Sequence, residues 1–207
     1  MATFKFYIPA INLMGAGCLQ EAAADIQGHG YRKALIVTDK ILGQSGVVGR
    51  LAALLAEHGI DAVVFTHGAP YQSQAVRDVD YGGVVGVLEA IGDRPVRIAL
   101  MTAIGLTNRA GGYHDWKRRS ERLVRASGHP HTIVRPGWFD YHEPDQHQLH
   151  FLQGQQRWAG SPADGVIARS QIADVLVGSL TCEAANAKTL DLVAEHGAAQ
   201  DDLEPLF

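Results

Sequence analysis

The sequence VRIALMT at residues 96–102 is a short, almost unbroken run of apolar residues. Such a run is typical of a strand that is buried on both faces of a parallel sheet. Three further runs of the same kind are KALIVTD (33–39), DAVVF (61–65) and HTIVRP (131–136). Together the four runs predict the central strands of a parallel sheet.

Longer segments with helical spacing separate these runs. In SGVVGRLAALLAEHG (45–59), Val48, Leu51 and Leu55 recur at helical spacing, and Gly59 follows as a stop signal. Further helices are predicted at 79–92, 113–128 and 170–187. Alternating strands and helices with short connections predict an α/β fold with right-handed crossovers, here a Rossmann-like, doubly wound, mostly parallel sheet.

Both ends of the chain add to this sheet. Residues 4–30 predict two short strands, a glycine turn at 15–17 and a helix, so that an N-terminal hairpin precedes the first parallel strand. TLDLVAE (189–195) predicts a further strand, and an acidic tail follows it. Because no repeat or low-complexity linker interrupts the chain, we expect one domain over residues 1–207.

The composition excludes several classes of partner. Hydrophobic residues make up 46% and charged residues 19% of the chain, as in ordinary globular proteins. A formal net charge of −4 gives no basic patch for nucleic acid or for an anionic membrane. No membrane-spanning run or secretory leader is readable, and Cys18 and Cys182 lack metal-type or redox-type spacing. We therefore expect a cytoplasmic protein with reduced thiols; the oligomeric state stays open.

One glycine-rich segment has the spacing of a phosphate-binding loop. Gly43, Gly46 and Gly49 in GQSGVVG are three residues apart and open a predicted helix, where backbone N–H groups could approach a pyrophosphate. However, residues 38–42 separate them from the preceding strand, whereas a tight strand-to-helix turn needs glycine almost at once. The alternative is a plain loop with Ser45 as the helix N-cap.

The motifs NLMGAGCL (12–19), GYRKALIVTDK (30–40) and GVVGRLAALLAEHGI (46–60) resemble the N-terminus of iron-containing alcohol dehydrogenases. This resemblance, over residues 1–60, implies that Asp39 lies near the adenosine ribose of the cofactor and favours NAD over NADP. The later phosphate loop and the metal ligands of that family have no counterpart in the chain. No bound metal is therefore expected.

From residue 61 to 207 the chain resembles another family. The motifs DAVVFTHG, DVDYGGV, VRIALMTAIG, YHDWK, SERLVRASG, TIVRPGWF and IARSQIADVLVGSL are similar, in order, to atypical, NmrA-like short-chain dehydrogenase/reductases. This resemblance implies a Rossmann fold that binds NAD or NADP. One strand–helix unit of that family is replaced and about one is absent, so the chain reads as a chimera of two dehydrogenase lineages.

Tyr113 and Lys117 in YHDWK are the candidate proton-transfer pair. Residues at i and i+4 share a helix face, and a nearby cation lowers the pKa of a phenol from about 10 toward the range of acid–base catalysis. The resemblance implies that Tyr113 is the acid/base and that Lys117 also binds the nicotinamide ribose. It also implies a third polar group that orients the substrate carbonyl, for which Thr102 is the nearest counterpart and Thr107 the alternative. Taken alone, a Tyr-xxx-Lys pair is as readily part of a solvated helix face.

Other candidate cofactor contacts follow two of the predicted strands. By the resemblance, Thr66, His67 and Gly68 lie at the adenosine and ribose, with Gly68 permitting close backbone approach or forming a plain turn. Pro136 and Gly137 correspond to the segment beside the nicotinamide carboxamide, unless they only break the strand.

Two further groups of polar residues receive a structural interpretation. His142, His147 and His150 lie in a polar loop without metal-type spacing, so no metal site is predicted there. Arginines in the predicted helix at 113–128 form a basic stripe, interpreted as a solvated face rather than a 2′-phosphate clamp: Arg118, Arg119, Arg122 and Arg125.

These observations predict an NAD(P)-dependent oxidoreductase of the short-chain type. It would transfer hydride to or from a small carbonyl or alcohol substrate, and residues 138–161 would line the substrate pocket. The alternatives are a nonenzymatic, NmrA-like regulatory protein that binds NAD(P), and a fusion whose cofactor binding is impaired.

Overall fold

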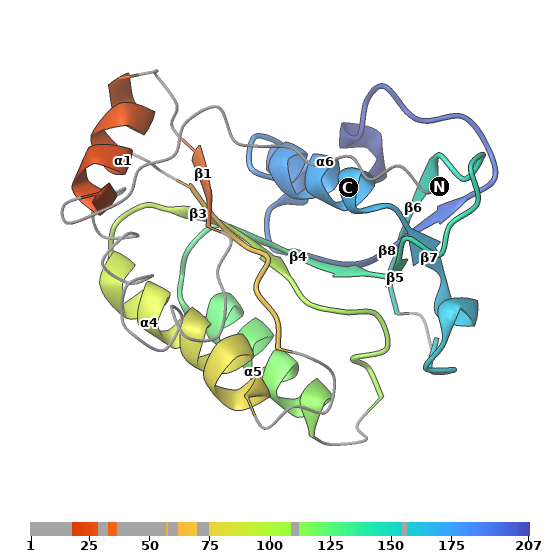
Figure 1. Cartoon of the computed structure of the whole chain (residues 1–207), viewed down its shortest axis with the longest axis horizontal. Helices are drawn as coiled ribbons and strands as arrows, with labels where there is room; N and C mark the ends of the chain where they lie inside the picture. Colours follow the sequence, from red (N-terminus) through yellow and green to blue (C-terminus); the bar gives the residue numbers. More distant parts are fainter. Residues whose placement is uncertain are drawn as a thin grey trace, which may run out of the picture.

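A computed structural model describes residues 18–28, 33–36, 57, 62–69, 75–108, 112–154 and 157–207. Within these residues a curved, mostly parallel sheet has helices on both faces (Figure 1). The predicted α/β, Rossmann-like class is confirmed. In the part of the chain described, no helix is long and apolar enough to cross a membrane.

The strands with the longest apolar runs form the parallel part of the sheet. The order is β1-β2-β3-β4-β8-β7-β5, and β6 pairs with β8 in antiparallel orientation. Neighbours from β1 to β4, and β4 with β8, are parallel. The bounds are Lys33–Ile36 (β1), Ala62–Phe65 (β2), Arg97–Met101 (β3), His131–Pro136 (β4), Trp138–Phe139 (β5), Gln148–Leu152 (β6), Val166–Ile167 (β7) and Lys188–Glu195 (β8). The predicted strands therefore match β1 to β4 and β8, whereas β5 to β7 were not predicted.

Helices cover the two faces of the sheet in separate layers (Figure 1). The helices are α1 (Cys18–Gly28), α4 (Gly82–Ile91), α5 (Tyr113–Ala126) and α6 (Arg169–Ser179), and a π-helical turn, η1 (Arg77–Tyr81), leads into α4. Helix α4 connects β2 to β3, and α5 connects β3 to β4. Because both connections are right-handed and lead to the next strand on the same side, the two helices lie on the same face of the sheet. Apolar side chains of α4, α5 and the sheet form one core cluster. Those of α6 pack against the sheet in a second cluster.

One helical prediction differs from the structure at its C-terminal end. The helix predicted at 170–187 ends at Ser179. Residues 183–185 form a separate 3₁₀ turn, where the carbonyl of Ala185 accepts a hydrogen bond from Thr132 Oγ1 of β4 at 2.8 Å. This contact with the sheet replaces the last turns of the predicted helix.

Several predicted features lie outside the described residues. These are the two strands of the N-terminal hairpin, almost all of the helix at 45–59, and the cofactor candidates Asp39, Gly43, Gly46 and Gly49. The helix predicted after the hairpin is confirmed as α1.

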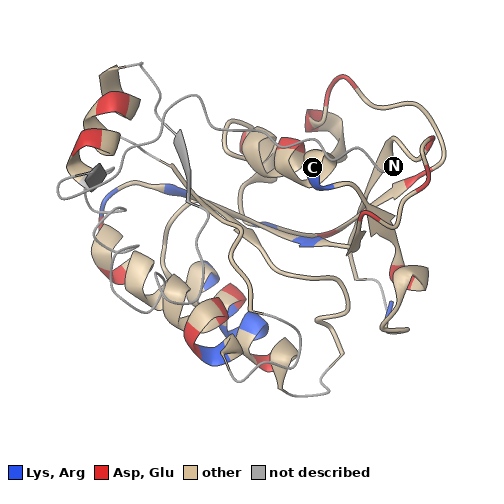
Figure 2. Cartoon of the chain, viewed as in Figure 1, with Lys and Arg blue, Asp and Glu red and all other residues tan. Residues whose placement is uncertain are grey.

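Charged residues of both signs are mixed on the described surface. Along α5, Lys and Arg alternate with Asp and Glu (Figure 2). The described elements thus show no large basic face, as the net charge predicts.

Candidate functional site

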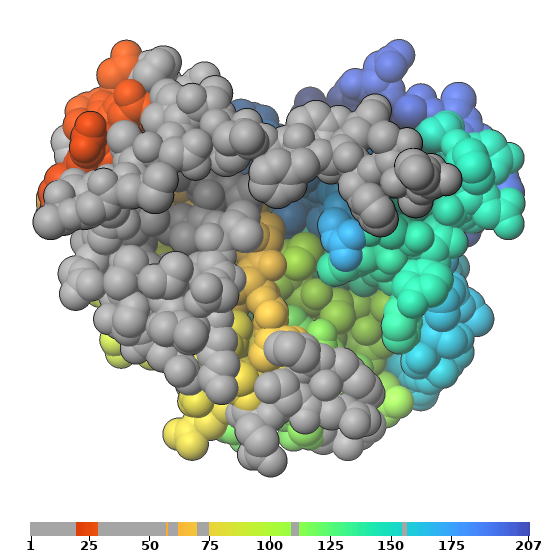
Figure 3. All heavy atoms as spheres, viewed as in Figure 1, coloured from red at the N-terminus to blue at the C-terminus, as the bar shows by residue number. Residues whose placement is uncertain are grey.

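A cavity of about 300 Å³ lies at the carboxyl ends of β3 and β4. In open α/β sheets this is the edge at which ligands bind. Figure 3 shows green atoms of the region after β3 in a hollow beside teal and light-blue atoms of later segments. The lining residues are Thr102, Ala103, Ile104, Gly105, Asn108, Tyr113, His114, Pro136, Gly137, Trp138, Phe139, Trp158, Gly160 and Asp164. The fold therefore brings four predicted site residues to one cavity: Thr102, Tyr113, Pro136 and Gly137.

Tyr113 is the first residue of α5, at the mouth of this cavity. It follows Gly112, whose φ of 57° is in the left-handed region that favours glycine. One turn later on the same helix, Lys117 Nζ lies 5.1 Å from the centroid of the Tyr113 ring. The predicted pair is thus close in space, with the ammonium near the ring.

Lys117 is buried and does not itself line the cavity. Its ammonium forms an ion pair with Asp80 of η1, which is 3% exposed. The second carboxylate oxygen of Asp80 accepts a hydrogen bond from Ala69 N at 2.9 Å. Asp80 thus holds the side chain of Lys117, which comes from α5, against η1. Asp80 was not among the predicted site residues, although an acidic residue in the apolar segment VDYGGVV was a readable signal.

Thr102 follows β3 and is buried against α5. Its hydroxyl donates a hydrogen bond to Glu121 Oε1 at 2.9 Å. Since a hydroxyl has one proton, Thr102 offers the cavity an acceptor in this arrangement. The alternative residue, Thr107, is exposed and accepts a hydrogen bond from the indole N–H of Trp158 at 2.7 Å. A role for Thr102 in orienting a carbonyl requires that its hydrogen bond to Glu121 be exchanged.

Glu121 is the centre of a buried charge network that the sequence analysis missed. It is 1% exposed and accepts two hydrogen bonds from Arg135 of β4, at 2.8 and 2.6 Å. Arg125 of the same helix donates another, at 3.1 Å. Burial alone would raise the pKa of Glu121, but the arginines and Thr102 hold it below its ordinary value. The ionised carboxylate therefore ties α5 to the ends of β3 and β4.

Asp191 of β8 lies on the other side of Arg135, with its carboxylate 3.7 Å from the guanidinium. Burial raises the pKa of Asp191 from 3.8 to about 6, although the charge of Arg135 acts against this rise. Between these two values the folded protein binds more protons than the unfolded chain. The free energy of unfolding therefore falls as the pH rises from about 4 to about 6.

Asp191→Asn is expected to remove this part of the pH dependence. Relative to the variant, the wild type should lose up to about 3 kcal/mol of unfolding free energy between pH 4 and pH 7. Urea unfolding at three pH values in this range measures the difference, with the exposed Asp201→Asn as the control. An equal pH dependence in wild type and Asp191→Asn would contradict the assignment.

Residues 66–68 follow β2 and lie beside the Lys117–Asp80 pair. A methyl group on Gly68 would come within 3.7 Å of Lys117 Nζ and of Asp80 Oδ1. Burial lowers the pKa of His67, so its imidazole is neutral at pH 7. The buried Oγ1 of Thr66 has no hydrogen-bond partner among the described residues. Buried hydroxyls are almost always hydrogen-bonded, so this atom fits a ligand with a polar group at the end of β2.

Pro136 and Gly137 form the end of β4 and the start of a switch in strand pairing. Gly137 N donates to Leu192 O of β8 at 2.8 Å, whereas Trp138 N donates to Gly165 O beside β7 at 2.9 Å. A Cβ at position 137 would lie 2.5 Å from Gly165 O. The close approach of these two backbones therefore requires glycine at position 137, whatever its role toward a ligand.

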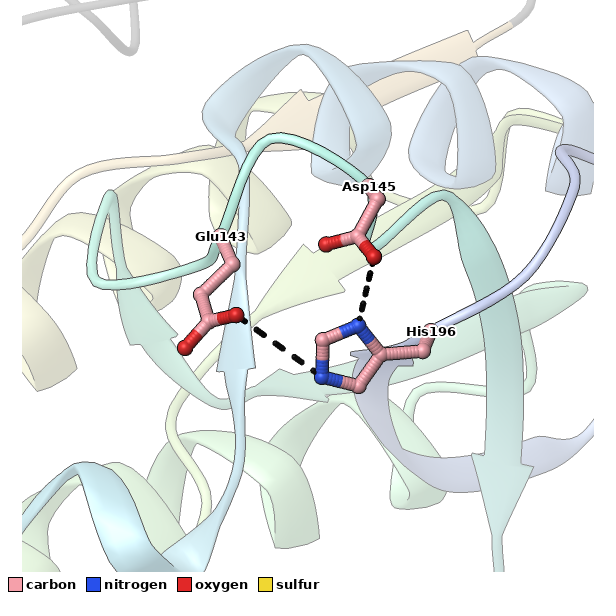
Figure 4. Close-up of side chains that lie close together, drawn as sticks. All are labelled: Glu143, Asp145 and His196. Carbon is pink, nitrogen blue, oxygen red and sulfur yellow. Dashed lines mark hydrogen bonds and ion pairs between the residues drawn. The ribbon is translucent and has the colours of Figure 1, made fainter.

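The loop that contains His142 and His147 also contains Glu143 and Asp145. These two acidic residues form an exposed cluster with His196, near the end of β8 (Figure 4). His196 Nδ1 lies 2.9 Å from Asp145 Oδ2, and His196 Nε2 lies 3.9 Å from Glu143 Oε2. The hydrogen bond with Asp145 raises the pKa of His196. Because all three side chains are exposed and the histidine is paired with both carboxylates, we interpret the cluster as an ion-pair network.

Comparisons with known proteins agree with the fold. The model of a family described as NAD(P)H-binding matches residues 41–183. Alcohol dehydrogenase 4 of Saccharomyces cerevisiae (strain YJM789) is 40% identical over 65 residues, which are 31% of this chain and 17% of that protein. The chain thus spans less than a fifth of this relative's length.

Two solved structures share the fold at low sequence identity. A putative NAD-dependent epimerase/dehydratase from Bacillus halodurans is similar with a TM-score of 0.58 and 17% identity, over 89% of this chain and 91% of that chain. A short-chain dehydrogenase/reductase from Veillonella parvula, solved in complex with NADP, has a TM-score of 0.52 and 14% identity. That likeness covers 88% of this chain and 93% of the other.

Proposed function

Because the chain belongs to the NAD(P)H-binding family, we propose that it is an NAD(P)-dependent oxidoreductase of the short-chain dehydrogenase/reductase type. Its substrate would be a small carbonyl compound or the corresponding alcohol. The observation that carries this proposal is the shared cavity of Tyr113 and Thr102, with the Lys117 ammonium 5.1 Å from the Tyr113 ring. The likeness to dehydrogenases in fold supports it.

The chain's own residues supply proton transfer. When bound, NAD(P) would supply the hydride chemistry at the carbon of the carbonyl or alcohol substrate. Tyr113 gives its phenolic proton to the carbonyl oxygen during reduction and takes it back during oxidation. The Lys117 ammonium stabilises the phenolate electrostatically, and Asp80 holds the ammonium in place.

The described residues that would hold the cofactor lie at the ends of β2 and β4. The Thr66 hydroxyl would bind a ribose or phosphate oxygen, Gly68 and His67 would lie beside it, and Lys117 would bind the nicotinamide ribose. Pro136 and Gly137 would border the nicotinamide. Gly43, Gly46 and Gly49 remain predicted contacts of the phosphates, and Asp39 remains a predicted determinant of NAD preference.

A second candidate function is nonenzymatic binding of NAD(P) by a regulatory protein. The hydrogen bond from Thr102 to Glu121 favours it, because the cavity then lacks the donor that would orient a carbonyl. Under this proposal the cofactor binds but no carbonyl compound is reduced.

Calorimetric titration with NAD⁺, NADH, NADP⁺ and NADPH tests both proposals. We expect at least one dinucleotide to bind, and Thr66→Val to weaken its binding about three- to tenfold because one hydrogen bond is lost. The same substitution should not lower stability, because the hydroxyl has no described partner in the free protein. Thr181→Val, on the exposed end of α6, is the control.

The outcomes separate the candidates. Absence of binding by all four dinucleotides at millimolar concentration would reject cofactor use by this chain. Binding without turnover of any carbonyl compound would favour the nonenzymatic protein. Unchanged binding in Thr66→Val would remove Thr66 from the cofactor site.

A further inference from the structure

We propose that the cavity selects planar aromatic carbonyl compounds without negative charge, and that Trp158 and Trp138 are the residues that recognise the ring system. This inference rests on the proposed function and names the substrate class of the same site.

The cavity is lined largely by rings. Tyr113, Trp138, Phe139 and Trp158 come from three different segments of the chain and meet at this one place. Trp138 and Trp158 are 36% and 46% exposed, which is unusual for side chains of this size. Exposed indoles beside a cavity offer flat surfaces on which a planar ligand gains both burial and stacking. The lining therefore favours an aromatic ligand.

Among the described residues that line the cavity, none is a lysine or an arginine, and burial lowers the pKa of the one histidine, His114. The carboxylate in this described lining is that of Asp164, which is 4% exposed. The two oxygens of this carboxylate accept hydrogen bonds from Ala159 N and Gly160 N, both at 2.8 Å. Beneath the lining, Lys117 is paired with Asp80, and Arg118 binds the carbonyl of Leu106 at 3.1 Å. Among the described lining residues, a carboxylate or phosphate would therefore find no lysine or arginine to offset its lost hydration.

The position of Trp158 is fixed by contacts on both sides of the cavity. Residues 157–164 form a loop, here called the Trp158 loop. Asp164 holds the backbone of this loop, and the indole N–H of Trp158 donates to Thr107 Oγ1 across the entrance. The backbone of the loop also approaches the opposite wall, since a Cβ on Gly105 would lie 3.4 Å from Arg157 O. The ring is therefore held in place before a ligand binds, which favours recognition of one ligand shape.

The size of the cavity sets the size of the ligand. A volume of about 300 Å³ is at the lower end for small-molecule sites. Under the proposed function the nicotinamide would take the part of this volume beside Pro136 and Gly137. The remainder suits at most about two fused rings that carry a carbonyl group next to Tyr113. We therefore choose a two-ring ketone as the probe.

Three matched ketones test the selection. 2-Acetylnaphthalene is planar and uncharged, 6-acetyl-2-naphthoate adds a carboxylate to the same rings, and 2-acetyldecalin keeps the size but loses aromaticity. Calorimetric titration of the full chain, with and without each dinucleotide, measures binding without requiring turnover. We expect 2-acetylnaphthalene to bind at least about tenfold more tightly than either analogue. Equal binding of the decalin, or equal or tighter binding of the carboxylate, would overturn the proposal.

Substitutions at Trp158 and Thr107 separate the contribution of the indole ring to binding from that of the hydrogen bond between these two residues. Trp158→Leu removes the aromatic surface and should weaken binding of 2-acetylnaphthalene about tenfold, while Trp138→Leu should have a similar effect. Thr107→Val removes the hydroxyl that accepts from the indole N–H but keeps the Trp158 ring, and it should weaken binding at most about threefold. Unchanged binding in both leucine variants would exclude the two indoles from recognition. Trp138 and Trp158 are both partly exposed, so the two leucine variants should fold.

Turnover distinguishes this inference from the proposed function. If 2-acetylnaphthalene binds selectively but is not reduced with NADH or NADPH, the selection holds and the oxidoreductase proposal fails. If aliphatic and aromatic ketones are reduced with equal kcat/KM, the oxidoreductase proposal holds and the selection fails.

Discussion

Replacing Glu121 with alanine is expected to lower the free energy of unfolding by about 3–5 kcal/mol, the usual cost of removing one partner from a buried ion pair. Glu121 is 1% exposed and binds Arg135, whose side chain is only 14% exposed. Without Glu121, Arg135 would keep only the more distant Asp191, at 3.7 Å. The Thr102 hydroxyl would also lose its acceptor, so the variant perturbs the cavity as well as stability.

Urea unfolding at pH 7 measures this loss, and two other variants define its cause. Arg125→Ala removes a half-exposed partner of the same carboxylate and should cost at most about 1 kcal/mol. Glu121→Gln keeps the volume of the side chain, so a comparable loss in that variant assigns the effect to charge rather than to a cavity. A loss below about 1 kcal/mol in Glu121→Ala would show that the network contributes little.

Tyr113→Phe is expected to reduce turnover at least about a hundredfold, the low end of what general acid catalysis contributes. The substitution keeps the ring in the cavity and its contact with Lys117, and removes only the group that transfers the proton. Binding of the dinucleotide should change little, because the phenolic hydroxyl of Tyr113 is not one of the assigned cofactor contacts. Single-turnover kinetics under excess cofactor measure the chemical step directly.

Tyr81→Phe provides the matched control for this variant. Tyr81 is a half-buried tyrosine that packs against Trp116, 5.4 Å between ring centroids, and it does not line the cavity. Its hydroxyl should be dispensable for turnover. If Tyr113→Phe and Tyr81→Phe retained similar activity, Tyr113 would not be the proton donor, and the shared helix face with Lys117 would have only a structural role.

The long apolar strands could be predicted from the sequence because burial on both faces leaves a continuous apolar run. The strand HTIVRP coincides with β4 residue for residue. By contrast, β5 and β7 have two residues each, and they exist because the backbones at Gly137 and Gly165 approach closely. A strand of two residues is too short to show a periodic pattern, so β5 and β7 could not be predicted from the sequence.

The candidate site was predictable in part. Tyr113 and Thr102 were found because family motifs mark them, and they do line one cavity. The basic stripe of α5 was predicted as a solvated face, and Arg119, Arg122 and Arg125 are indeed exposed. Arg118 is half-buried and binds backbone carbonyls of the loop after β3, while Arg125 also binds Glu121 and Thr189. Which charged residues of a helix face the sheet depends on the rotation of the helix, and a segment as polar as YHDWKRRSERL leaves that rotation undefined.

The Trp158 loop has a consequence for how this protein could acquire new substrates. Asp164 holds the loop through two backbone amides, whereas the ligand would contact side chains. These two contacts of the loop therefore do not depend on which residue occupies position 158, unlike the hydrogen bond from the Trp158 indole to Thr107. Substitutions at 158 and 138 should change which ligands bind without loss of the fold, and a small two-site library at these positions tests this expectation.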